Sequence, residues 1–374
     1  MGPAQNTWLL KVLKQPFLLC GNCSQLKSAA VMTPEILILD GGLGTSLIRK
    51  YNVKFNNDTP LWTSHLVLSD RETLLRCQRD FGNLPVDIML TATYQISTEA
   101  FAKTRTKEFP SGIPSTHTPH IINDVVRVAE EAKQNTAKLA LSVGPYGAIM
   151  NPSQEYSGEY DQTHSSMESL HAWHAERLKL FTGITDIRSR LGYISFETLP
   201  RSDEIKATRK ALDDTVELAG IPFWTTCVYP DDKMTLPSGE SVREAVDAML
   251  NPKFAKATPW GVGINCTNVW KLDKLLREYE NAISDMIREG RVQQWPALVL
   301  YPDGVNGEKF NYDTMRWELP EDERYTIKTP WEEQVAQVVR ATQDRGNWPQ
   351  IVVGGCCLST SDTIGRLRSL LIPE

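Results

Sequence analysis

From Ile36 onward, short apolar segments alternate with longer stretches in which apolar residues recur at helical spacing. Strands that are apolar along their whole length, and that are separated by one helix each, are buried on both faces as in a parallel sheet. Eight such units predict a single-domain α/β protein, a (β/α)8 or TIM barrel, and an open doubly wound sheet is the alternative. The expected strands are residues 36–40, 86–93, 138–144, 192–198, 222–228, 260–265, 297–301 and 350–354.

The segments between these strands predict helices, two of which have a serine in position to cap them. Ser202 and Ser241 are the expected N-cap residues. Residues 301–323, rich in Pro, Asp and Gly, are expected to form a loop over one mouth of the barrel. Residues 1–34 read as an N-terminal extension, poorly ordered, which leaves 35–374 for the barrel domain. The expected helices include residues 165–191, 203–219, 241–250, 272–287 and 331–343.

The charge and the cysteine usage narrow the range of partners. A net charge of -6 with scattered Lys and Arg offers no basic field for nucleic acid. No apolar run approaches the roughly 20 residues that cross a bilayer, so no membrane partner is expected either. Seven widely separated cysteines, an odd number in a large chain, predict free thiols in a reducing cytoplasm. Lysines without acidic residues in 1–34 leave mitochondrial targeting as an alternative, and the sequence does not define the oligomeric state.

Unusual polar residues fall at the carboxyl ends of the expected strands. Asp40 ends the first strand, Thr93 the second and Glu197 lies near the end of the fourth. Cys266 follows the sixth strand and the pair Cys356-Cys357 follows the eighth. Because all of these ends meet at one face of a parallel barrel, the pattern predicts one shared pocket.

The three cysteines in this pocket have the chemistry of a metal site. Cys266, Cys356 and Cys357 could converge on one zinc ion at about 2.3 Å per sulfur. Three protein thiolates would leave a fourth position open, which suits the binding of a substrate thiol as thiolate. The alternative is that these cysteines are small buried hydrophobic residues without a ligand role.

Five motifs occur here in the order seen in homocysteine S-methyltransferases. They are LDGGLGT at 39–45, TATYQ at 91–95, FETLP at 196–200, GINC at 263–266 and GGCC at 354–357. The chain resembles that family from about residue 35 to 370. The resemblance implies that Cys266, Cys356 and Cys357 hold zinc, and that Asp40 and Glu197 bind the amino group of homocysteine. It also implies substrate contacts for four further residues of these motifs, Thr45, Thr93, Tyr94 and Asn265.

Two further segments bear on the methyl donor. Residues 142–148 and 155–160 look like the members of the family that use S-methylmethionine or S-adenosylmethionine, and less like the betaine-dependent branch. The implied reaction is zinc-dependent transfer of a methyl group from a sulfonium donor to L-homocysteine, giving methionine. Methylation of another thiol or of a selenol such as selenocysteine is an alternative. A non-catalytic zinc-binding member of the family is another.

The chain departs from the family pattern in two places. After the cysteine pair it has LSTSD at 358–362, without the proline of a Thr-Pro-like turn. In the seventh unit it has YPDGVNGE at 301–308, with Asp303 where the family segment has Asn. Because of the first departure, the sequence does not predict the conformation of the turn after the cysteine pair. The second departure could change the substrate preference.

Several residues also have a structural interpretation. Asp40 could form a turn before Gly41, and Glu197 could pair with a buried arginine. His171 and His174 share one helix face, but a helix of the outer ring would direct them away from the pocket. Cys227, at the end of the fifth strand, is expected to pack in the core.

Overall fold

Eight parallel strands form the centre of the computed structural model, which describes residues 34–56, 58–134, 136–230, 232–305, 308–311, 316–318 and 329–373. All eight coincide with expected strands to within a few residues. The extension proposed for residues 1–34 lies outside the described residues, except for Pro34. The strands are β1 (Glu35–Ile38), β2 (Ile88–Leu90), β3 (Lys138–Val143), β4 (Tyr193–Leu199), β5 (Phe223–Cys227), β6 (Gly261–Asn265), β7 (Ala297–Tyr301) and β10 (Gln350–Val353).

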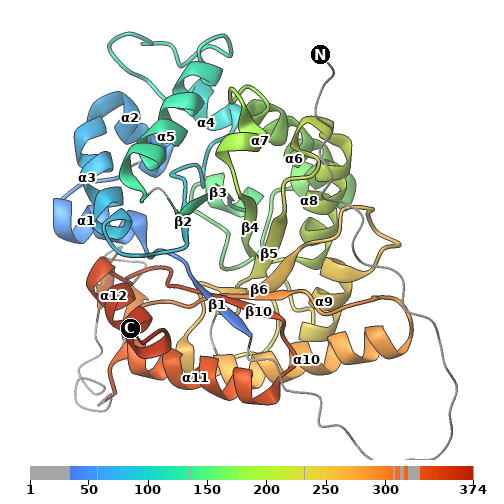
Figure 1. Cartoon of the computed structure of the whole chain (residues 1–374). Helices are drawn as coiled ribbons and strands as arrows, with labels where there is room; N and C mark the ends of the chain where they lie inside the picture. The colour runs from blue at the N-terminus through green and yellow to red at the C-terminus, as the bar shows by residue number, and fades with distance from the viewer. Residues whose placement is uncertain are drawn as a thin grey trace, which may run out of the picture. The chain divides into compact units, whose positions relative to one another are not determined.

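The sheet closes into a barrel. Its strand order is β1-β10-β7-β6-β5-β4-β3-β2, so each strand pairs with its neighbour in the succession of βα units. A parallel bridge between Leu39 and Ile88 joins the two ends of this order, and Asp87 N donates to Ile38 O at 2.8 Å. The (β/α)8 barrel is therefore confirmed and the open doubly wound sheet is excluded, as the ring of helices around the strands shows (Figure 1).

Helices connect successive strands, with two differences from the expected bounds. The segment 165–191 is divided into α6 and α7, and the segment 203–219 ends as a helix at Asp214 before a short 3-10 turn, η4. The helices are α1 (Leu43–Tyr51), α2 (Leu66–Ser69), α3 (Arg71–Gly82), α4 (Thr98–Lys103), α5 (Thr118–Ala132), α6 (Met167–Phe181), α7 (Ile187–Arg190), α8 (Ser202–Asp214), α9 (Val242–Leu250), α10 (Leu272–Arg288), α11 (Trp331–Arg345) and α12 (Ser361–Leu371). The 3-10 turns are η1 (Trp62–His65), η2 (Tyr146–Ile149), η3 (Gln162–His164), η4 (Val216–Leu218) and η5 (Val269–Lys271).

One of the two expected caps is confirmed. The Ser241 hydroxyl accepts from Glu244 N, and the Glu244 carboxylate accepts from Ser241 N, which together form a capping box for α9. The expectation for Ser202 was wrong, because this serine is the first residue of α8 and its hydroxyl donates to Glu240 at 2.8 Å. Glu240, which is distant in the sequence, thus accepts hydrogen bonds from Ser202 at the start of α8. A local sequence pattern cannot predict such a contact.

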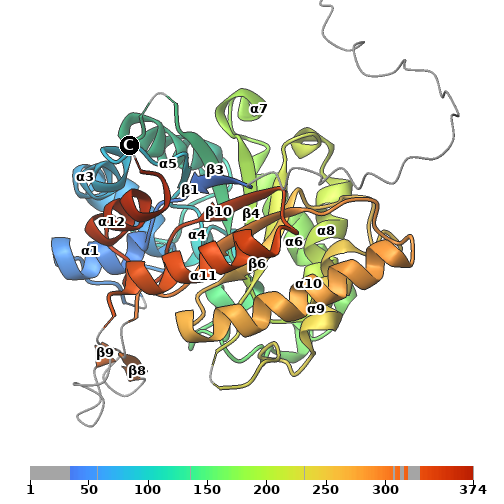
Figure 2. The same ribbon diagram turned by 60° about the horizontal axis from the view of Figure 1, so that its bottom comes forward.

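The segment expected as a loop at 301–323 contains a hairpin. Strands β8 (Lys309–Asn311) and β9 (Arg316–Glu318) pair antiparallel, and Figure 2 shows them standing away from the barrel strands. The residues between and after these strands lie outside the described part of the chain. Within the described part, no helix combines the length and apolar character needed to cross a membrane.

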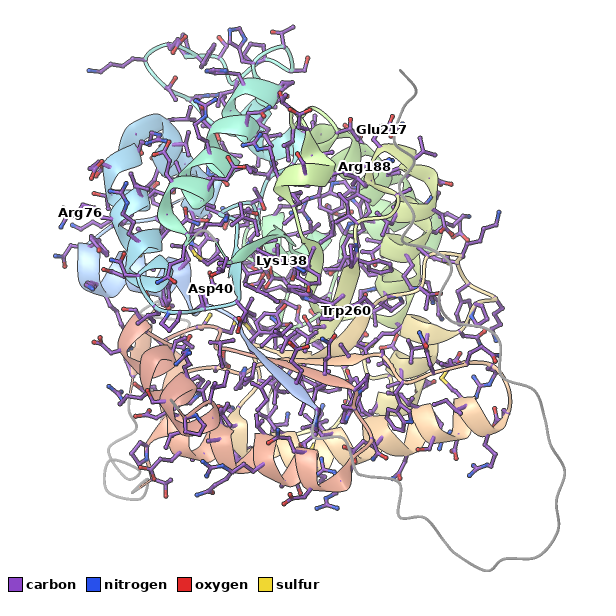
Figure 3. The ribbon with its side chains drawn as sticks, in the orientation of Figure 1. Asp40, Arg76, Lys138, Arg188, Glu217 and Trp260 are labelled. Atoms are coloured by element: carbon purple, nitrogen blue, oxygen red, sulfur yellow. A yellow bond between two sulfur atoms is a disulfide. The ribbon has the colours of Figure 1, made fainter. Side chains whose placement is uncertain are left out.

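The interior of the barrel is packed rather than hollow. Inward-facing residues of seven strands form one apolar cluster that includes Trp224, Val299 and Tyr301, while β6 contributes Gly261 and Gly263 beside it. At the amino ends of the strands, Tyr193 lies between the Trp260 ring, 4.9 Å away, and the Lys138 ammonium. Figure 3 shows side chains filling the space inside the ring of strands, with Lys138 and Trp260 near its centre. Among the described residues, the cavity inside the barrel is therefore found at the opposite mouth.

We expect Gly263→Ala to destabilise the protein, because a Cβ at this position would lie 1.8 Å from Val299 O in the adjacent strand. Gly263 and Val299 are paired in the parallel ladder of β6 and β7, so neither backbone can move away freely. The expected loss is about 1–3 kcal/mol of unfolding free energy, measured by urea denaturation. Gly365→Ala in α12 is the control, since its nearest neighbour would be 3.4 Å away. An alanine at 263 that leaves the urea midpoint unchanged contradicts this packing.

Candidate metal and substrate site

The carboxyl ends of the strands enclose a cavity, as the sequence predicted. Its walls come from the loops after five different strands and from η1, so residues more than 300 positions apart in the chain face one another. Such a cavity lies where barrel enzymes place their active sites. The residues that line it are Gly41, Gly42, Leu43, Gly44, Thr45, Trp62, Thr63, Leu90, Thr91, Ala92, Tyr94, Ser142, Glu155, Tyr156, Glu197, Thr198, Cys266, Tyr301, Gly355, Cys356 and Cys357.

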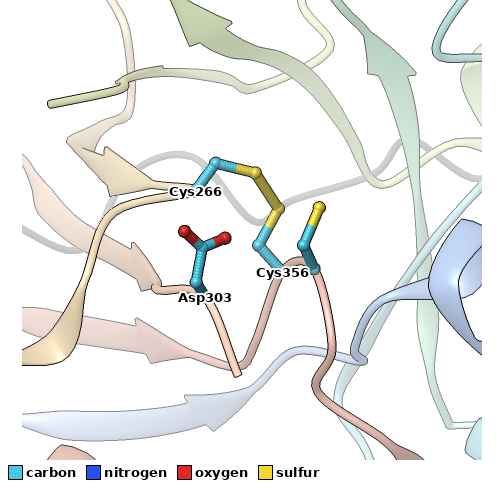
Figure 4. A group of neighbouring side chains, drawn as sticks. Cys266, Asp303 and Cys356 are labelled. Atoms are coloured by element: carbon cyan, nitrogen blue, oxygen red, sulfur yellow. A yellow bond between two sulfur atoms is a disulfide. The ribbon is translucent and has the colours of Figure 1, made fainter. Parts of the chain in front are cut away.

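Three cysteines and one aspartate meet at one side of this cavity. One ligand atom from each of Cys266, Asp303, Cys356 and Cys357 lies within 4.8 Å of the others. Sulfurs that share a tetrahedral zinc ion at 2.3 Å are themselves roughly 3.8 Å apart, so side chains gathered this closely could hold one ion when all three are reduced. The three cysteines that the sequence singled out thus converge. The sequence did not predict that Asp303 would join them. Figure 4 shows its carboxylate beside Cys266 and Cys356.

Two of the converging cysteines form a disulfide in this structure. The sulfurs of Cys266 and Cys356 are bonded, their Cα atoms are 5.4 Å apart, and Cys357 is free. The expectation of free thiols throughout was wrong for this pair. Thiols gathered closely enough to share one ion are also close enough to be oxidised to a disulfide. Because the thiolate is the metal ligand, only the reduced form can bind a metal through both sulfurs.

The turn after the cysteine pair is well supported without the family's proline. The Ser359 hydroxyl donates to Cys356 O at 2.6 Å, and Thr45 Oγ1 accepts from Leu358 N at 2.9 Å. Thr360 then caps α12 through a capping box with Thr363. This departure in sequence therefore leaves the cysteine loop anchored to α1 and α12.

The surroundings of Cys357 fit a cationic metal. Burial raises the pKa of this thiol well above its usual range, and the nearby charges of Asp303 and Glu155 raise it further. A divalent cation supplies the positive charge that would make buried thiols anionic. The Asn265 amide also points at Cys356, with Nδ2 4.0 Å from Sγ, in the manner of the hydrogen bonds that support metal-bound sulfur.

Two buried carboxyl groups belong to the same mouth of the barrel: Glu197 lines the cavity, and Asp40 directly precedes the lining residue Gly41. Asp40 is 4% exposed; its Oδ2 accepts from Leu90 N at 3.0 Å, and its Oδ1 has no partner among the described residues. Burial raises the pKa of Asp40 well above its ordinary value, and the charge of nearby Glu197 adds to this. Burial also raises the pKa of Glu197 to about 7, although Ser142 Oγ donates to its Oε1. These two groups are therefore costly to ionise unless a cation binds between them.

The structure does not show the turn at Asp40 or the arginine ion pair of Glu197 that were the structural alternatives for these residues. Asp40 bonds across to the backbone of β2 instead of closing a local turn. The buried Arg177 guanidinium donates to the carbonyl groups of Ile96, Gly144 and Tyr94, and none of the ion pairs found among the described residues includes Glu197. Neither carboxyl group thus forms an ion pair among the described residues, although the charge of Arg177 acts to lower the pKa of Glu197.

The other four expected contact residues divide into two pairs. Thr45 and Tyr94 line the cavity, and the Tyr94 hydroxyl donates to Glu155 at 2.6 Å. Thr93 and Asn265 are fully buried behind its wall: the Thr93 hydroxyl donates to Ser142 O, and the Asn265 amide bridges to both N and Oγ1 of Thr198. These bonds give Thr93 and Asn265 a supporting role, while Thr91 lines the cavity near Thr93.

Sequence reasoning did not assign Glu155 or Tyr156 to this cavity, which Trp62 lines as well. Glu155 and Tyr156 come from the loop after β3, and burial raises the pKa of Glu155 to about 7. The Trp62 ring stands edge-on to Tyr94 with centroids 5.8 Å apart. The motif at 155–160 could have indicated these residues. It lies well beyond the end of β3 in the sequence, however, so its position in the cavity wall could not be predicted.

The histidines and Cys227 lie apart from the cluster. His171 bonds to Asp214 at 2.7 Å, and the buried His174 bonds to Glu204 at 2.9 Å, so both join α6 to α8. Cys227 is fully buried and free. Both arrangements agree with the structural interpretation of these residues.

Comparison with known proteins gives consistent results. The family model for homocysteine S-methyltransferase matches residues 37–371. Homocysteine S-methyltransferase 1 of Arabidopsis thaliana is 25% identical over 93% of each chain. Betaine-homocysteine S-methyltransferase of Drosophila melanogaster is 28% identical over 87% of this chain and 91% of its own. The metallated form of the homocysteine methyltransferase MmuM from Escherichia coli shares the fold, with a TM-score of 0.63 and 22% identity over 90% of this chain and 96% of that one.

We expect Glu197→Gln to flatten the dependence of stability on pH in metal-free, reduced protein. The pKa of Glu197 is about 7 when folded against 4.5 as its ordinary value, so its stabilising contribution is complete below pH 4.5 and is lost as pH rises through 7. That loss amounts to something on the order of 3 kcal/mol. At pH 8 the glutamine variant should therefore unfold at higher urea than the wild type, and at pH 5 the difference should shrink.

The matched control is Glu176→Gln, an exposed carboxylate on α6, which should leave the pH profile unchanged. Identical pH profiles for Glu197→Gln and the wild type would show that Glu197 is already ionised in the folded protein at pH 5.

Proposed function

The chain belongs to the homocysteine S-methyltransferase family, and from that premise we propose that it transfers a methyl group from a sulfonium donor to homocysteine, with zinc held by Cys266, Cys356 and Cys357. The observation that carries the proposal is the convergence of these sulfurs at a cavity that Glu197 lines and Asp40 adjoins, two buried carboxyl groups without an ion-pair partner among the described residues. Homocysteine has a thiol for the sulfur cluster and an ammonium for the carboxyl groups.

The amino end of the acceptor would lie between Asp40 and Glu197. Asp40 Oδ1 is a buried acceptor without a donor, and an unsatisfied buried acceptor costs about 1–3 kcal/mol. An ammonium placed there donates to this oxygen and offsets the repulsion between the two carboxylates. Binding of the cationic amine would thus shift both groups toward their ionised forms, and the amine would fix the orientation of the acceptor.

Zinc suits the sulfur cluster by its ligand preference and size. Three thiolates within a few ångströms are ligands for zinc rather than for magnesium or calcium, which take oxygen. When bound, zinc would supply deprotonation of the substrate thiol at neutral pH. The chain itself keeps the sulfurs in place through the turn residues Thr45 and Ser359.

The donor would lie against the remaining walls. Trp62, Tyr94 and Tyr156 present aromatic surface, and Glu155 adds a carboxyl group in the same part of the cavity. Aromatic faces and a carboxylate both favour a cationic methyl donor over a neutral one. A sulfonium becomes a neutral thioether when its methyl group leaves, so this site needs no acid to protonate the leaving group. The motifs at 142–148 and 155–160 favour S-methylmethionine or S-adenosylmethionine.

We expect the reduced, zinc-loaded protein to form methionine from homocysteine with S-methylmethionine or S-adenosylmethionine, and to do so poorly with betaine. Product formation is measured by chromatography with each donor supplied separately. Selenocysteine in place of homocysteine tests the alternative acceptor, and its preference in direct competition would reassign the substrate. Stoichiometric zinc without a methylated product from any of these donors would identify a non-catalytic member of the family.

We expect Cys356→Ser to lose bound zinc and to lower methionine formation by at least about a hundredfold, because a metal ligand is removed. Metal content after dialysis is measured by mass spectrometry, with and without a chelator. Cys77→Ser is the matched control: Cys77 is buried in the core and lies outside the cluster. Retention of one zinc per chain by Cys356→Ser would contradict the ligand assignment.

A further inference from the structure

We propose that Arg177 is a positioning residue for the methyl donor: it fixes the two loops that bring Tyr94 and Glu155 together in the cavity wall. The inference rests on the proposed function, because the donor is the substrate that this wall would hold. It comes from the hydrogen bonds of the Arg177 guanidinium, from the packing of the Tyr94 ring, and from the comparison with a second buried arginine.

Arg177 reaches from α6, in the ring of helices (Figure 1), to the loops after β2 and β3. It is 2% exposed, and each nitrogen of its guanidinium donates to a backbone carbonyl group. Nε donates to Ile96 O at 2.6 Å, while Nη1 and Nη2 donate to Gly144 O and Tyr94 O at 2.5 Å each. Because the guanidinium is planar and its donors have fixed directions, it holds the three carbonyl groups in one arrangement.

The Tyr94 ring is fixed by several further contacts. Gly144 N donates to Tyr94 O at 3.2 Å, which also joins the two loops directly. The ring packs so closely on Gly144 that a Cβ there would lie 2.6 Å from Tyr94 Cε2. The Trp62 ring lies edge-on to it, and the Tyr94 hydroxyl donates to Glu155 at 2.6 Å. Arg177 at the backbone and Glu155 at the hydroxyl thus determine together where the ring lies.

The hydrogen bond between Tyr94 and Glu155 joins two groups that suit a cation. An aromatic face attracts a cation within about 6 Å of the ring centroid, so displacement of the ring weakens the attraction. The same hydrogen bond sets the direction of the Glu155 carboxyl group beside the ring. A sulfonium at this wall would therefore contact both groups in a geometry that Arg177 determines, although Arg177 itself lies outside the cavity lining.

Arg209 provides a comparison within the same chain. It is also fully buried, and its guanidinium also donates to backbone carbonyl groups, those of Ala248, Asn251, Ala255 and Ala257. These four residues lie outside the cavity lining, whereas Tyr94 is part of it. The two arginines thus hold backbone segments in the same way, and Arg177 does so next to the wall proposed for the donor.

The test compares Arg177→Lys with Arg209→Lys in the reduced, zinc-loaded full-length protein. Lysine keeps the positive charge, which also acts on Glu197, and removes the planar set of donors. We expect Arg177→Lys to raise the KM for S-methylmethionine or S-adenosylmethionine about tenfold, the size of a displaced cation–π contact, and to leave the KM for homocysteine little changed. Arg209→Lys is the matched control: it should lower the urea midpoint as Arg177→Lys does, with both KM values unchanged.

Gly144→Ala reaches the same ring without altering the arginine, and it carries the test if Arg177→Lys does not fold. The added methyl group would displace the Tyr94 ring, so the KM for the donor should rise here as well. Tyr94→Phe removes the hydroxyl bond to Glu155 and gives a further readout. Its effect on the donor KM and that of Arg177→Lys should be less than additive in the double variant, because both act through one ring.

The outcomes separate this inference from the proposed function. Methyl transfer with the same donor KM in the wild type, Arg177→Lys and Gly144→Ala would overturn the positioning role and leave the proposed function intact. Equal increases in both KM values, in Arg177→Lys and Arg209→Lys alike, would show a general loss of structure and would also overturn it. Absence of methyl transfer from any sulfonium donor in the wild type would remove the proposed function, and the donor wall with it.

Discussion

The cavity depends on buried carboxyl groups for which the described residues provide no ion-pair partner. Asp40, Glu155, Glu197 and Asp303 are all held where burial raises their pKa, and none forms an ion pair among the described residues. Transfer of a carboxylate from water into such a site is unfavourable without a positive partner. The folded protein must therefore keep these groups protonated or bind cations. The ligands proposed here, an ammonium, a sulfonium and a metal ion, are all cations.

The closed barrel is what brings these groups together. In a parallel barrel every strand contributes its carboxyl end to one face, so Asp40 from the first unit lies near Cys356 from the last. Gly355 N donates to Asp40 O at 3.1 Å, which joins the backbone of Asp40 directly to the cysteine loop. The opposite mouth is filled by Tyr193 and its neighbours, so in the described part of the chain the cavity opens on the side that carries the carboxyl groups.

Much of this arrangement could be predicted because it depends on the periodicity of apolar residues and on the position of polar residues just after the strands. Buried parallel strands are apolar along their length, and the residues just after them must lie at one mouth, which was sufficient to group Cys266 with Cys356 and Cys357. Asp303 was missed because an aspartate between Pro302 and Gly304 has the ordinary composition of a turn. Glu155 was missed because it lies in a loop that turns back to the cavity, and no periodic pattern in the sequence predicts the path of that loop. The disulfide depends on oxidation state, which composition does not fix.

Several residues around the cavity have backbone conformations with positive φ, which residues other than glycine rarely adopt. Trp62, Thr198, Cys266 and Leu358 have positive φ angles of 47°, 60°, 45° and 65°. Such residues cost of order 1–3 kcal/mol each and persist only where neighbouring contacts determine them. Here the Asn265 amide holds Thr198 through two hydrogen bonds, and Thr45 holds Leu358. These hydrogen bonds hold the loops that carry the cavity residues in place, so less of the binding energy of a ligand is needed to assemble the site.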